Sequence, residues 1–268
     1  MKTHVIRRAR PLLGTFVEIT ARGRDAARLE RAVGAAFATI ERLQARLNVH
    51  DPASEVSRLN CTAQRRPMAV SGDTWRLLRA AKRMSLLSAG AFDVTAPRAR
   101  GGGDFRDIAL LRGRRVRFAR TLRVDLGGIA KGYCVDRAVA ALARFGVRSG
   151  LVNAGGDLRA FGAHAYPLQL RHPADPRALL AWGRVRNAAV ATSARYRTGR
   201  DRCAGALVHG CSGAPIDAGI SVSVRAERAW VADALTKVVM LRGAAAADVL
   251  ARYRARAWVL GTEGGAPE

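Results

Sequence analysis

The segment over residues 24–47 constrains the fold most, because apolar side chains recur in it at intervals of three and four residues. This spacing places them in one stripe along a helix, and such a stripe must be buried against another element. We therefore predict a long amphipathic helix that lies across a sheet. The stripe consists of Ala26, Leu29, Val33, Phe37, Ile40, Leu43 and Leu47.

Strand-like and helix-like patterns alternate along the rest of the chain, which predicts a mixed α+β fold. Ser54 precedes the first short helix as its N-cap, and Gly90 follows the end of the next helix. Besides 24–47, helices are expected at residues 54–60, 73–88, 131–145, 229–241 and 244–253. Strands are expected at 16–19, 115–118, 151–153, 158–161, 168–170, 182–185, 188–191, 220–224 and 257–260, with a turn at 11–15 and a loop at 98–104.

The 268 residues, of which 49% are hydrophobic, can bury a substantial core. Neither an internal repeat nor a linker separates two units, so we predict one domain over residues 1–261 and a flexible tail over 262–268. No stretch approaches the roughly 20 apolar residues that span a bilayer. No apolar run of signal-peptide length precedes the first predicted strand, which favours a cytoplasmic protein.

The net charge of +25 arises from 46 Lys and Arg against 21 Asp and Glu. Such a balance is typical of proteins that bind polyanions. The arginines are scattered, however, and we find neither a basic stripe interleaved with aromatics nor a zinc or helix-turn-helix module. The four cysteines also lack paired CxxC spacing. We therefore predict no nucleic-acid partner and interpret the arginines as solvated surface.

Residues 124–132, VDLGGIAKG, carry the strongest indication of chemistry. Asp125 ends a predicted strand, and Gly127 and Gly128 would leave backbone groups uncovered. Lys131 follows at the start of a helix, where exposed amides and the helix dipole attract anions. A carboxylate beside a phosphate site binds a metal, a ribose or an adenine amine. The spacing matches neither the Walker nor the Rossmann motif, so a purely structural turn is the alternative.

Three other segments combine turns with polar side chains. Residues 153–157, NAGGD, form a second glycine turn whose alternative is a tight hairpin with positive φ. Asp233 and Lys237 lie four residues apart on one face of a helix, where both side chains point to one place such as a bound cation. In 90–95, GAFDVT, Phe92 either flanks a flat ring or belongs to the core.

In this order the segments resemble the FAD:protein FMN transferase family, also called ApbE. The resemblance covers nearly the whole chain and implies a T-fold-like α+β architecture with mixed sheets and packed helices. The matching segments are 13–15 (LGT), 54–60 (SEVSRLN), 90–95 (GAFDVT), 124–132 with Val135 and Asp136, 151–157 (LVNAGGD), 191–193 (ATS) and 232–235 (ADAL).

The resemblance implies an enzyme that takes FAD as substrate and Mg²⁺ as cofactor. Such an enzyme splits the pyrophosphate, passes the FMN half to a Thr or Ser hydroxyl of an acceptor protein and releases AMP. Two alternatives use the same site: hydrolysis of FAD to FMN and AMP, and a non-catalytic module that binds flavin or docks a partner.

Residue by residue, the resemblance implies two sets of contacts. Gly128, through its backbone carbonyl, and Asp233 match the magnesium ligands of the family. The residues that match its cofactor-binding motifs are Leu13, Asn60, Ala91, Phe92, Asp93, Asp125, Lys131 and Thr192.

The sequence departs from the family pattern at three places. Lys237 stands where the family usually has Thr, and we expect its ammonium to pair with Asp233 because it cannot ligate Mg²⁺ while protonated. Ala206 stands in place of a His, and His209, three residues later, is our candidate catalytic substitute; an ordinary loop histidine is the alternative. Ala194 replaces a Gly and would be strained if its φ were positive.

Overall fold

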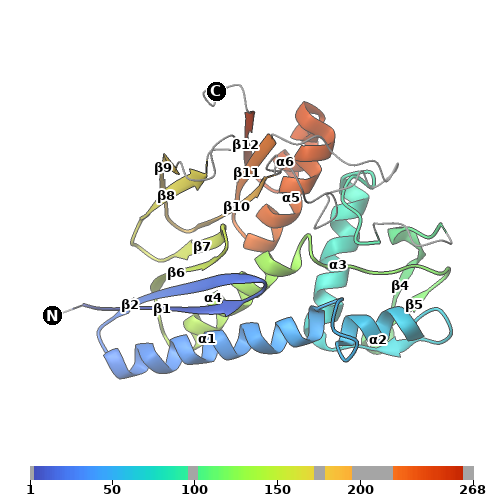
Figure 1. Cartoon of the computed structure of the whole chain (residues 1–268), viewed down its shortest axis with the longest axis horizontal. Helices are drawn as coiled ribbons and strands as arrows, with labels where there is room; N and C mark the ends of the chain where they lie inside the picture. The colour runs from blue at the N-terminus through green and yellow to red at the C-terminus, as the bar shows by residue number, and fades with distance from the viewer. Residues whose placement is uncertain (1–2, 96–101, 172–178, 195–219, 262–268) are drawn as a thin grey trace, which may run out of the picture.

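The computed structural model describes residues 3–95, 102–171, 179–194 and 220–261. Its largest element is a seven-stranded antiparallel sheet with the strand order β1-β2-β6-β7-β10-β11-β12. Figure 1 shows this sheet on the left, with the N-terminus at one end and the C-terminus at the other. The strands are β1 (His4–Leu12), β2 (Thr15–Gly23), β6 (Ser149–Ala154), β7 (Asp157–Phe161), β10 (Ala188–Ala194), β11 (Ile220–Ala226) and β12 (Arg256–Gly261).

Two smaller sheets complete the strands of the described residues. β3 (Met68–Ala69), β5 (Arg115–Phe118) and β4 (Ile108–Leu111) form a three-stranded sheet, and β8 (Tyr166–Arg171) pairs with β9 (Leu179–Val185). Short 3₁₀ turns at Phe105–Asp107 and Arg112–Arg114 flank β4. The mixture of helices with antiparallel sheets confirms the predicted α+β class.

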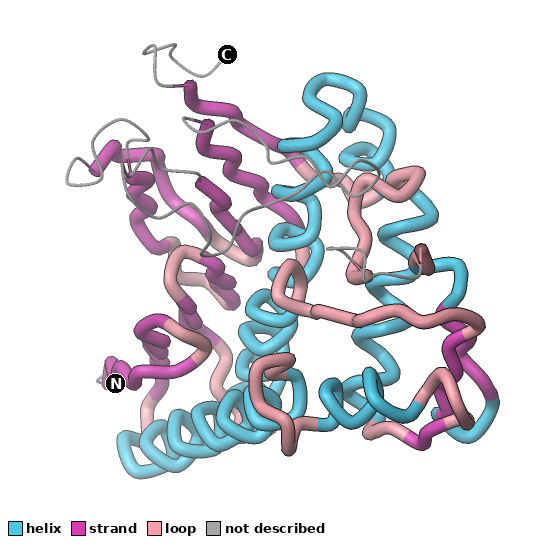
Figure 2. Tube along the Cα trace, turned by 45° about the vertical axis from the view of Figure 1, so that its right-hand side comes forward, coloured by secondary structure: helices cyan, strands magenta, loops and turns pink. Residues whose placement is uncertain are grey.

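The helices lie together along one side of the large sheet, between it and the three-stranded sheet of β3, β5 and β4 (Figure 2). They are α1 (Ala26–Leu47), α2 (Glu55–Thr62), α3 (Gly72–Leu87), α4 (Ala130–Arg144), α5 (Ala229–Arg242) and α6 (Ala247–Arg252), with a 3₁₀ turn at Gly243–Ala246 before α6. The side chains of Asp25, Ser54 and Ser71 accept backbone N–H groups and begin α1, α2 and α3. None of the helices in the described ranges is long and apolar enough to cross a membrane.

The predicted amphipathic helix is confirmed as α1, which runs beneath the β1–β2 hairpin (Figure 1). Six residues of the predicted stripe, from Leu29 to Leu47, are buried. α1 packs against β1, β2 and α4, so its stripe faces both a sheet and a second helix. This packing places the C-terminal end of α1 beside the start of α4.

The core extends over both faces of β7 and β10. Ala189 and Ala191 belong to the main core with the helices, whereas Ala188 and Val190 pack with the β8–β9 hairpin. This alternation is expected of a strand buried on both faces. The helices α4 and α5 contact each other, and α5 lies against β10 and β11.

Several predicted elements differ from the structure. β1, β3 and β4 were not predicted, and the segment before Asp125 is irregular rather than a strand. The helix predicted over 244–253 is a 3₁₀ turn followed by the short α6. Ala194 lies in β10 and pairs with Ser221, so its backbone is extended and unstrained.

The second glycine turn forms the tight hairpin between β6 and β7. Gly155 and Gly156 have φ values of 62° and 104°, which side-chain-bearing residues rarely adopt. A Cβ at Gly155 would also lie 2.5 Å from Thr15 Oγ1. The turn therefore requires glycine for its backbone shape and for close contact with β2, as the structural alternative for this segment predicted.

Candidate active site

A cleft of about 410 Å³ opens where the β1–β2 turn, the end of α1 and the start of α4 meet. Three of the predicted cofactor-binding residues line it: Leu13 from the turn, Asp125 from residues 124–132, which we call the glycine segment, and Lys131 at its junction with α4. Leu13 is more than one hundred residues from Asp125 and Lys131 along the chain. The fold therefore brings part of the predicted site into one concave surface, which is where ligands usually bind.

The Leu13 backbone is shaped for this position. Its φ is 57° and that of Gly14 is 71°, so the β1–β2 hairpin turns through two left-handed residues. The Leu13 N–H donates to the side chain of Gln44 on α1. This contact fixes the rim of the cleft to the helix beneath it.

Several backbone amides of the glycine segment are hydrogen-bonded, and the Gly127 N–H is not uncovered as predicted. The Asp125 carboxylate accepts the Gly127 N–H at 2.8 Å, and the Asp125 N–H donates to Val94 O. The amides of Ile129 and Ala130 both donate to Leu126 O. Because these amides are already paired, the side chain of Lys131 and the dipole of α4 remain as the main attraction for an anion.

Lys131 belongs to a cluster of four charged residues at the junction of α4, α5 and β7. Its ammonium lies 3.3 Å from Asp157 Oδ2, and the Lys237 ammonium contacts Asp233 Oδ1. Asp157 and Asp233 are buried, at 2% and 0% exposure. The pair of Lys237 with Asp233 confirms the expected i, i+4 contact on α5.

The surroundings shift the ionisation of this cluster. Burial and the nearby Asp233 raise the pKa of Asp157 to about 7, although Lys237 and Lys131 act in the opposite direction. Burial lowers the pKa of Lys131, but the carboxylates of Asp157 and Asp233 outweigh it, so the net pKa is raised. Lys131 therefore stays charged at neutral pH and is available to an anionic ligand.

Gly128 lies next to Phe92 and to the end of the Lys237 side chain. A Cβ added to Gly128 would be 3.4 Å from Phe92 Cε2 and 3.8 Å from Lys237 Cε. Phe92 is 4% exposed and belongs to the main core, as the structural alternative predicted. The two predicted metal-binding residues, Gly128 and Asp233, are thus both neighbours of one lysine side chain.

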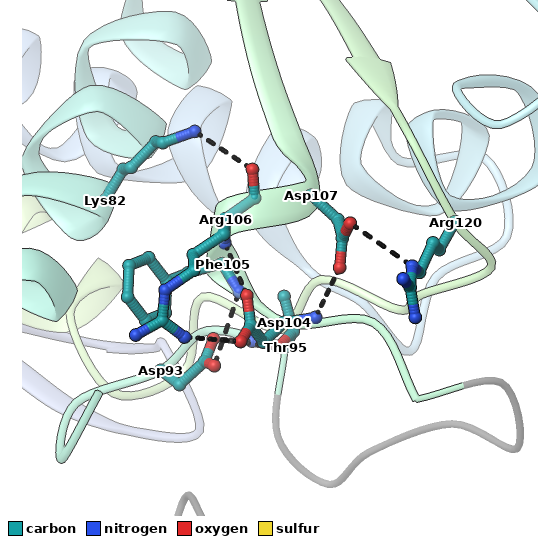
Figure 3. Close-up of polar contacts among 8 residues, drawn as sticks. All are labelled: Lys82, Asp93, Thr95, Asp104, Phe105, Arg106, Asp107 and Arg120. Atoms are coloured by element: carbon teal, nitrogen blue, oxygen red, sulfur yellow. Dashed lines mark hydrogen bonds and ion pairs between the residues drawn. The ribbon is translucent and has the colours of Figure 1, made fainter. Parts of the chain in front are cut away.

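Asp93 accepts hydrogen bonds from its own segment and from the short turn before β4, as Figure 3 shows. Its Oδ1 accepts the backbone N–H and the hydroxyl of Thr95, both at 2.8 Å, and its Oδ2 accepts the Phe105 N–H at 3.4 Å. Burial raises the pKa of the Asp93 carboxyl, and the Thr95 and Phe105 donors partly oppose this. Asp104 and Asp107 cap the short turn that presents Phe105. Asp93 therefore connects the GAFDVT segment to the residues that precede β4.

The remaining predicted cofactor-binding residues do not line the cleft. The Asn60 amide donates to Val124 O at 2.9 Å and accepts the Val124 N–H at 2.8 Å, so it positions the glycine segment from α2. Thr192 shares a 2.8 Å hydrogen bond with Ser223 across β10 and β11. Ala91 donates its N–H to Ser88 O in the turn after α3. His209 and Ala206 lie outside the described residues.

Several cleft residues were not predicted from the sequence. Gln44, Asn48 and His50 line it from the end of α1 and the following loop, and Cys134 lines it from α4. The apolar spacing over residues 24–47 indicated where α1 ends, but not which side chains would face α4. Asp157 was part of a recognised motif, yet its burial beside Lys131 depends on contacts between distant segments.

A cleft bordered by a glycine turn and by a lysine at a helix start, on an antiparallel sheet backed by helices, defines an α+β protein suited to an anionic ligand. The sequence model of the ApbE family matches residues 13–259. The chain belongs to the ApbE family.

Individual relatives agree with this assignment. The chain is similar to the FAD:protein FMN transferase of Klebsiella pneumoniae (strain 342), with 29% identity over 185 residues; the match covers 60% of this chain and 58% of the relative. Its fold resembles Pseudomonas stutzeri flavinyl transferase ApbE in the apo form, with a TM-score of 0.83, 23% identity and coverage of 100% and 94%. Its fold also resembles the ApbE protein of Thermotoga maritima, with a TM-score of 0.82 and 26% identity. That match covers 99% of this chain and 96% of the other.

Proposed function

We propose that this protein transfers FMN from FAD to a Thr or Ser hydroxyl of an acceptor protein and releases AMP. The observation that carries the proposal is the convergence of Leu13, Asp125 and Lys131 on one cleft. These residues come from segments that match the family, and a relative carries the name FAD:protein FMN transferase. A dinucleotide with a charged pyrophosphate suits a cleft that has a lysine at the N-terminal end of α4.

The transfer is a displacement at phosphorus. The acceptor hydroxyl oxygen forms a bond to the phosphorus of the FMN half, the bond from that phosphorus to the bridging oxygen breaks, and AMP leaves with the electron pair. The hydroxyl proton passes to a base or to solvent. Lys131 stabilises the negative charge on the phosphoryl oxygens, and Asp125 orients the nucleotide at the rim of the cleft.

The magnesium site that the resemblance implies does not fit the residues present. Asp233 Oδ2 accepts the Gly132 N–H at 3.0 Å and Oδ1 contacts the Lys237 ammonium. Mg²⁺ requires six oxygen ligands in near-octahedral geometry. Proteins hold Mg²⁺ through one or two carboxylates together with waters and phosphates, and here the Asp233 carboxylate already contacts the Lys237 ammonium. We therefore assign no step of the transfer to a metal.

The proposal is tested by incubating the full chain with FAD and candidate acceptor proteins, in parallel with and without magnesium. We expect a covalently flavinylated acceptor that fluoresces in a denaturing gel, and one AMP released for each flavin attached. Lys131→Met should lower the yield strongly, whereas Arg117→Met, which removes an exposed charge on β5, should not. Release of AMP without acceptor would favour hydrolysis of FAD instead. Bound FAD without any product would favour the non-catalytic module.

A further inference from the structure

Both carboxylate oxygens of Asp233 and its backbone carbonyl already accept hydrogen bonds. Gly132 N–H donates to one carboxylate oxygen, and the Lys237 ammonium contacts the other. The same ammonium donates to Asp233 O at 2.9 Å, and Thr236 Oγ1 donates to that carbonyl at 2.7 Å. An ion that used this carboxylate as a ligand would have to displace Lys237.

The Lys237 side chain ends where the predicted cation would lie. Its Cε is close to Gly128, which is also a neighbour of Phe92, on the side of the glycine segment that faces α5. Its side chain is 16% exposed, so the ammonium is largely shielded from water. A divalent cation bound between Gly128 and Asp233 would lie within a few ångströms of this ammonium, and like charges at such distances repel strongly.

The ammonium also keeps a donor for a ligand. Lysine has three N–H donors, and Asp233 accepts two of them through Oδ1 and its backbone carbonyl. The described residues supply no acceptor for the third. Lys131, in the same cluster, presents a second ammonium that is 40% exposed. Both ammoniums lie beside residues 124–132, each also in contact with a carboxylate, and a lysine ammonium binds phosphate oxygens as a point charge.

We propose that the Lys237 ammonium takes the place of a divalent cation in this chain, so that it binds the pyrophosphate of FAD without magnesium. This inference rests on the proposed function because it concerns the same substrate. It reassigns Asp233 from a metal ligand to a residue that positions Lys237. The ammonium supplies one positive charge where Mg²⁺ supplies two, but it belongs to the chain, so binding does not depend on metal supply.

Two binding measurements on the full chain test this inference. The first is titration calorimetry of FAD in buffer with EDTA and in buffer with millimolar Mg²⁺; we expect dissociation constants that agree within about twofold. The second is the spin-resonance signal of Mn²⁺ alone, where we expect no saturable binding below millimolar concentration. At least tenfold tighter FAD binding with Mg²⁺, or saturable Mn²⁺ binding at micromolar concentration, would overturn the inference.

Substitutions at position 237 separate the ammonium from its surroundings. Lys237→Met keeps the length of the side chain without its charge and should weaken FAD binding about tenfold or more in both buffers, since a hydrogen bond to a charged group is lost. Lys237→Thr should bind Mn²⁺ and bind FAD more tightly with Mg²⁺ than with EDTA. Arg117→Met serves as the matched control, and thermal melts establish that each variant is folded. Unchanged FAD affinity in Lys237→Met would refute the role of the ammonium, and the wild-type measurements stand even if that variant does not fold.

The same data distinguish failure of this inference from failure of the proposed function. If wild-type protein binds FAD equally with EDTA and Mg²⁺ but flavinylates no acceptor, the transfer is wrong and the role of Lys237 stands. If transfer occurs only with Mg²⁺, the role of Lys237 is wrong and the transfer stands. No FAD binding in either buffer overturns both.

Discussion

The backbone N–H of Gly132 donates a 3.0 Å hydrogen bond to the buried Asp233 carboxylate, across 101 residues of sequence. This bond joins the first turn of α4 to α5, and it determines where Lys131 and Lys237 lie relative to each other. The two helices approach so closely that a Cβ at Gly132 would be 2.3 Å from Ala229 O. Gly132 is therefore needed because there is no room for a Cβ, and not because its backbone has a positive φ.

Gly132→Ala should therefore destabilise the protein. The added methyl group would push against the backbone of α5, and we expect a loss of about 3 kcal/mol in the free energy of unfolding. Urea denaturation measures it. Gly34→Ala on α1 is the matched control, because nothing lies within 4 Å of a Cβ there. That control should be neutral or stabilising by up to about 1 kcal/mol, and equal losses in the two variants would contradict the prediction.

Asn60→Ala should destabilise the glycine segment from a distance. Val124 is fully buried, and the variant leaves both its N–H and its C=O without their partner. We expect the free energy of unfolding to fall by about 2 kcal/mol, together with weaker FAD binding. Arg58→Ala, an exposed change on the same helix, should alter neither quantity. A normal unfolding curve for Asn60→Ala would show that water replaces the amide.

Cys134 should be unreactive although it lines the cleft. Burial raises the pKa of its thiol to about 12, so almost no thiolate exists at pH 8. Cys61 is exposed and serves as the internal comparison. We expect iodoacetamide at pH 8 to label Cys61 much faster than Cys134, as peptide mass spectrometry would show, and both to react once urea unfolds the chain. Similar rates for the two in folded protein would rule the prediction out.

Asp157 should make stability fall as pH rises. The pKa of an Asp in an unfolded chain is about 3.8, and that of Asp157 in the folded protein is about 7. Between these two pH values the folded chain holds a proton that the unfolded chain has lost. Its contribution is therefore present at low pH and lost as pH increases toward 7, at about 1 kcal/mol per pH unit. Urea denaturation from pH 4 to 8 should show this decline relative to Asp157→Asn. Parallel pH profiles for the two proteins would disprove it.

Local patterns in the sequence predicted the features that depend on local contacts. The stripe from Leu29 to Leu47 specified α1, and the four-residue interval specified the contact of Lys237 with Asp233. β1 was missed because Ile6 is its only buried residue and three of the other eight are arginines. The strand expected before Asp125 was wrong because the Asp125 and Val124 N–H groups bond to Val94 O and to the Asn60 side chain instead of to a strand.

Sequence motifs predicted only part of the candidate cleft, because its lining depends on contacts between distant segments. Leu13, Asp125 and Lys131 share a cleft, but Asn60 supports the glycine segment and Thr192 pairs within the sheet. Sequence motifs do not distinguish a residue that contacts a ligand from one that holds such a residue in place. The burial of Asp157 beside Lys131 follows only from the packing of β7 against α4.

The charged outer strand β1 also has a colloidal consequence. Arg7 pairs with Glu18 on β2, and Arg8 and Arg10 pair with Glu30 and Glu41 on α1. These arginines occupy one open edge of the large sheet, where an uncharged strand would recruit strands of other molecules. Because salt screens exposed charges, ionic strength sets how well this edge resists self-association during purification and storage.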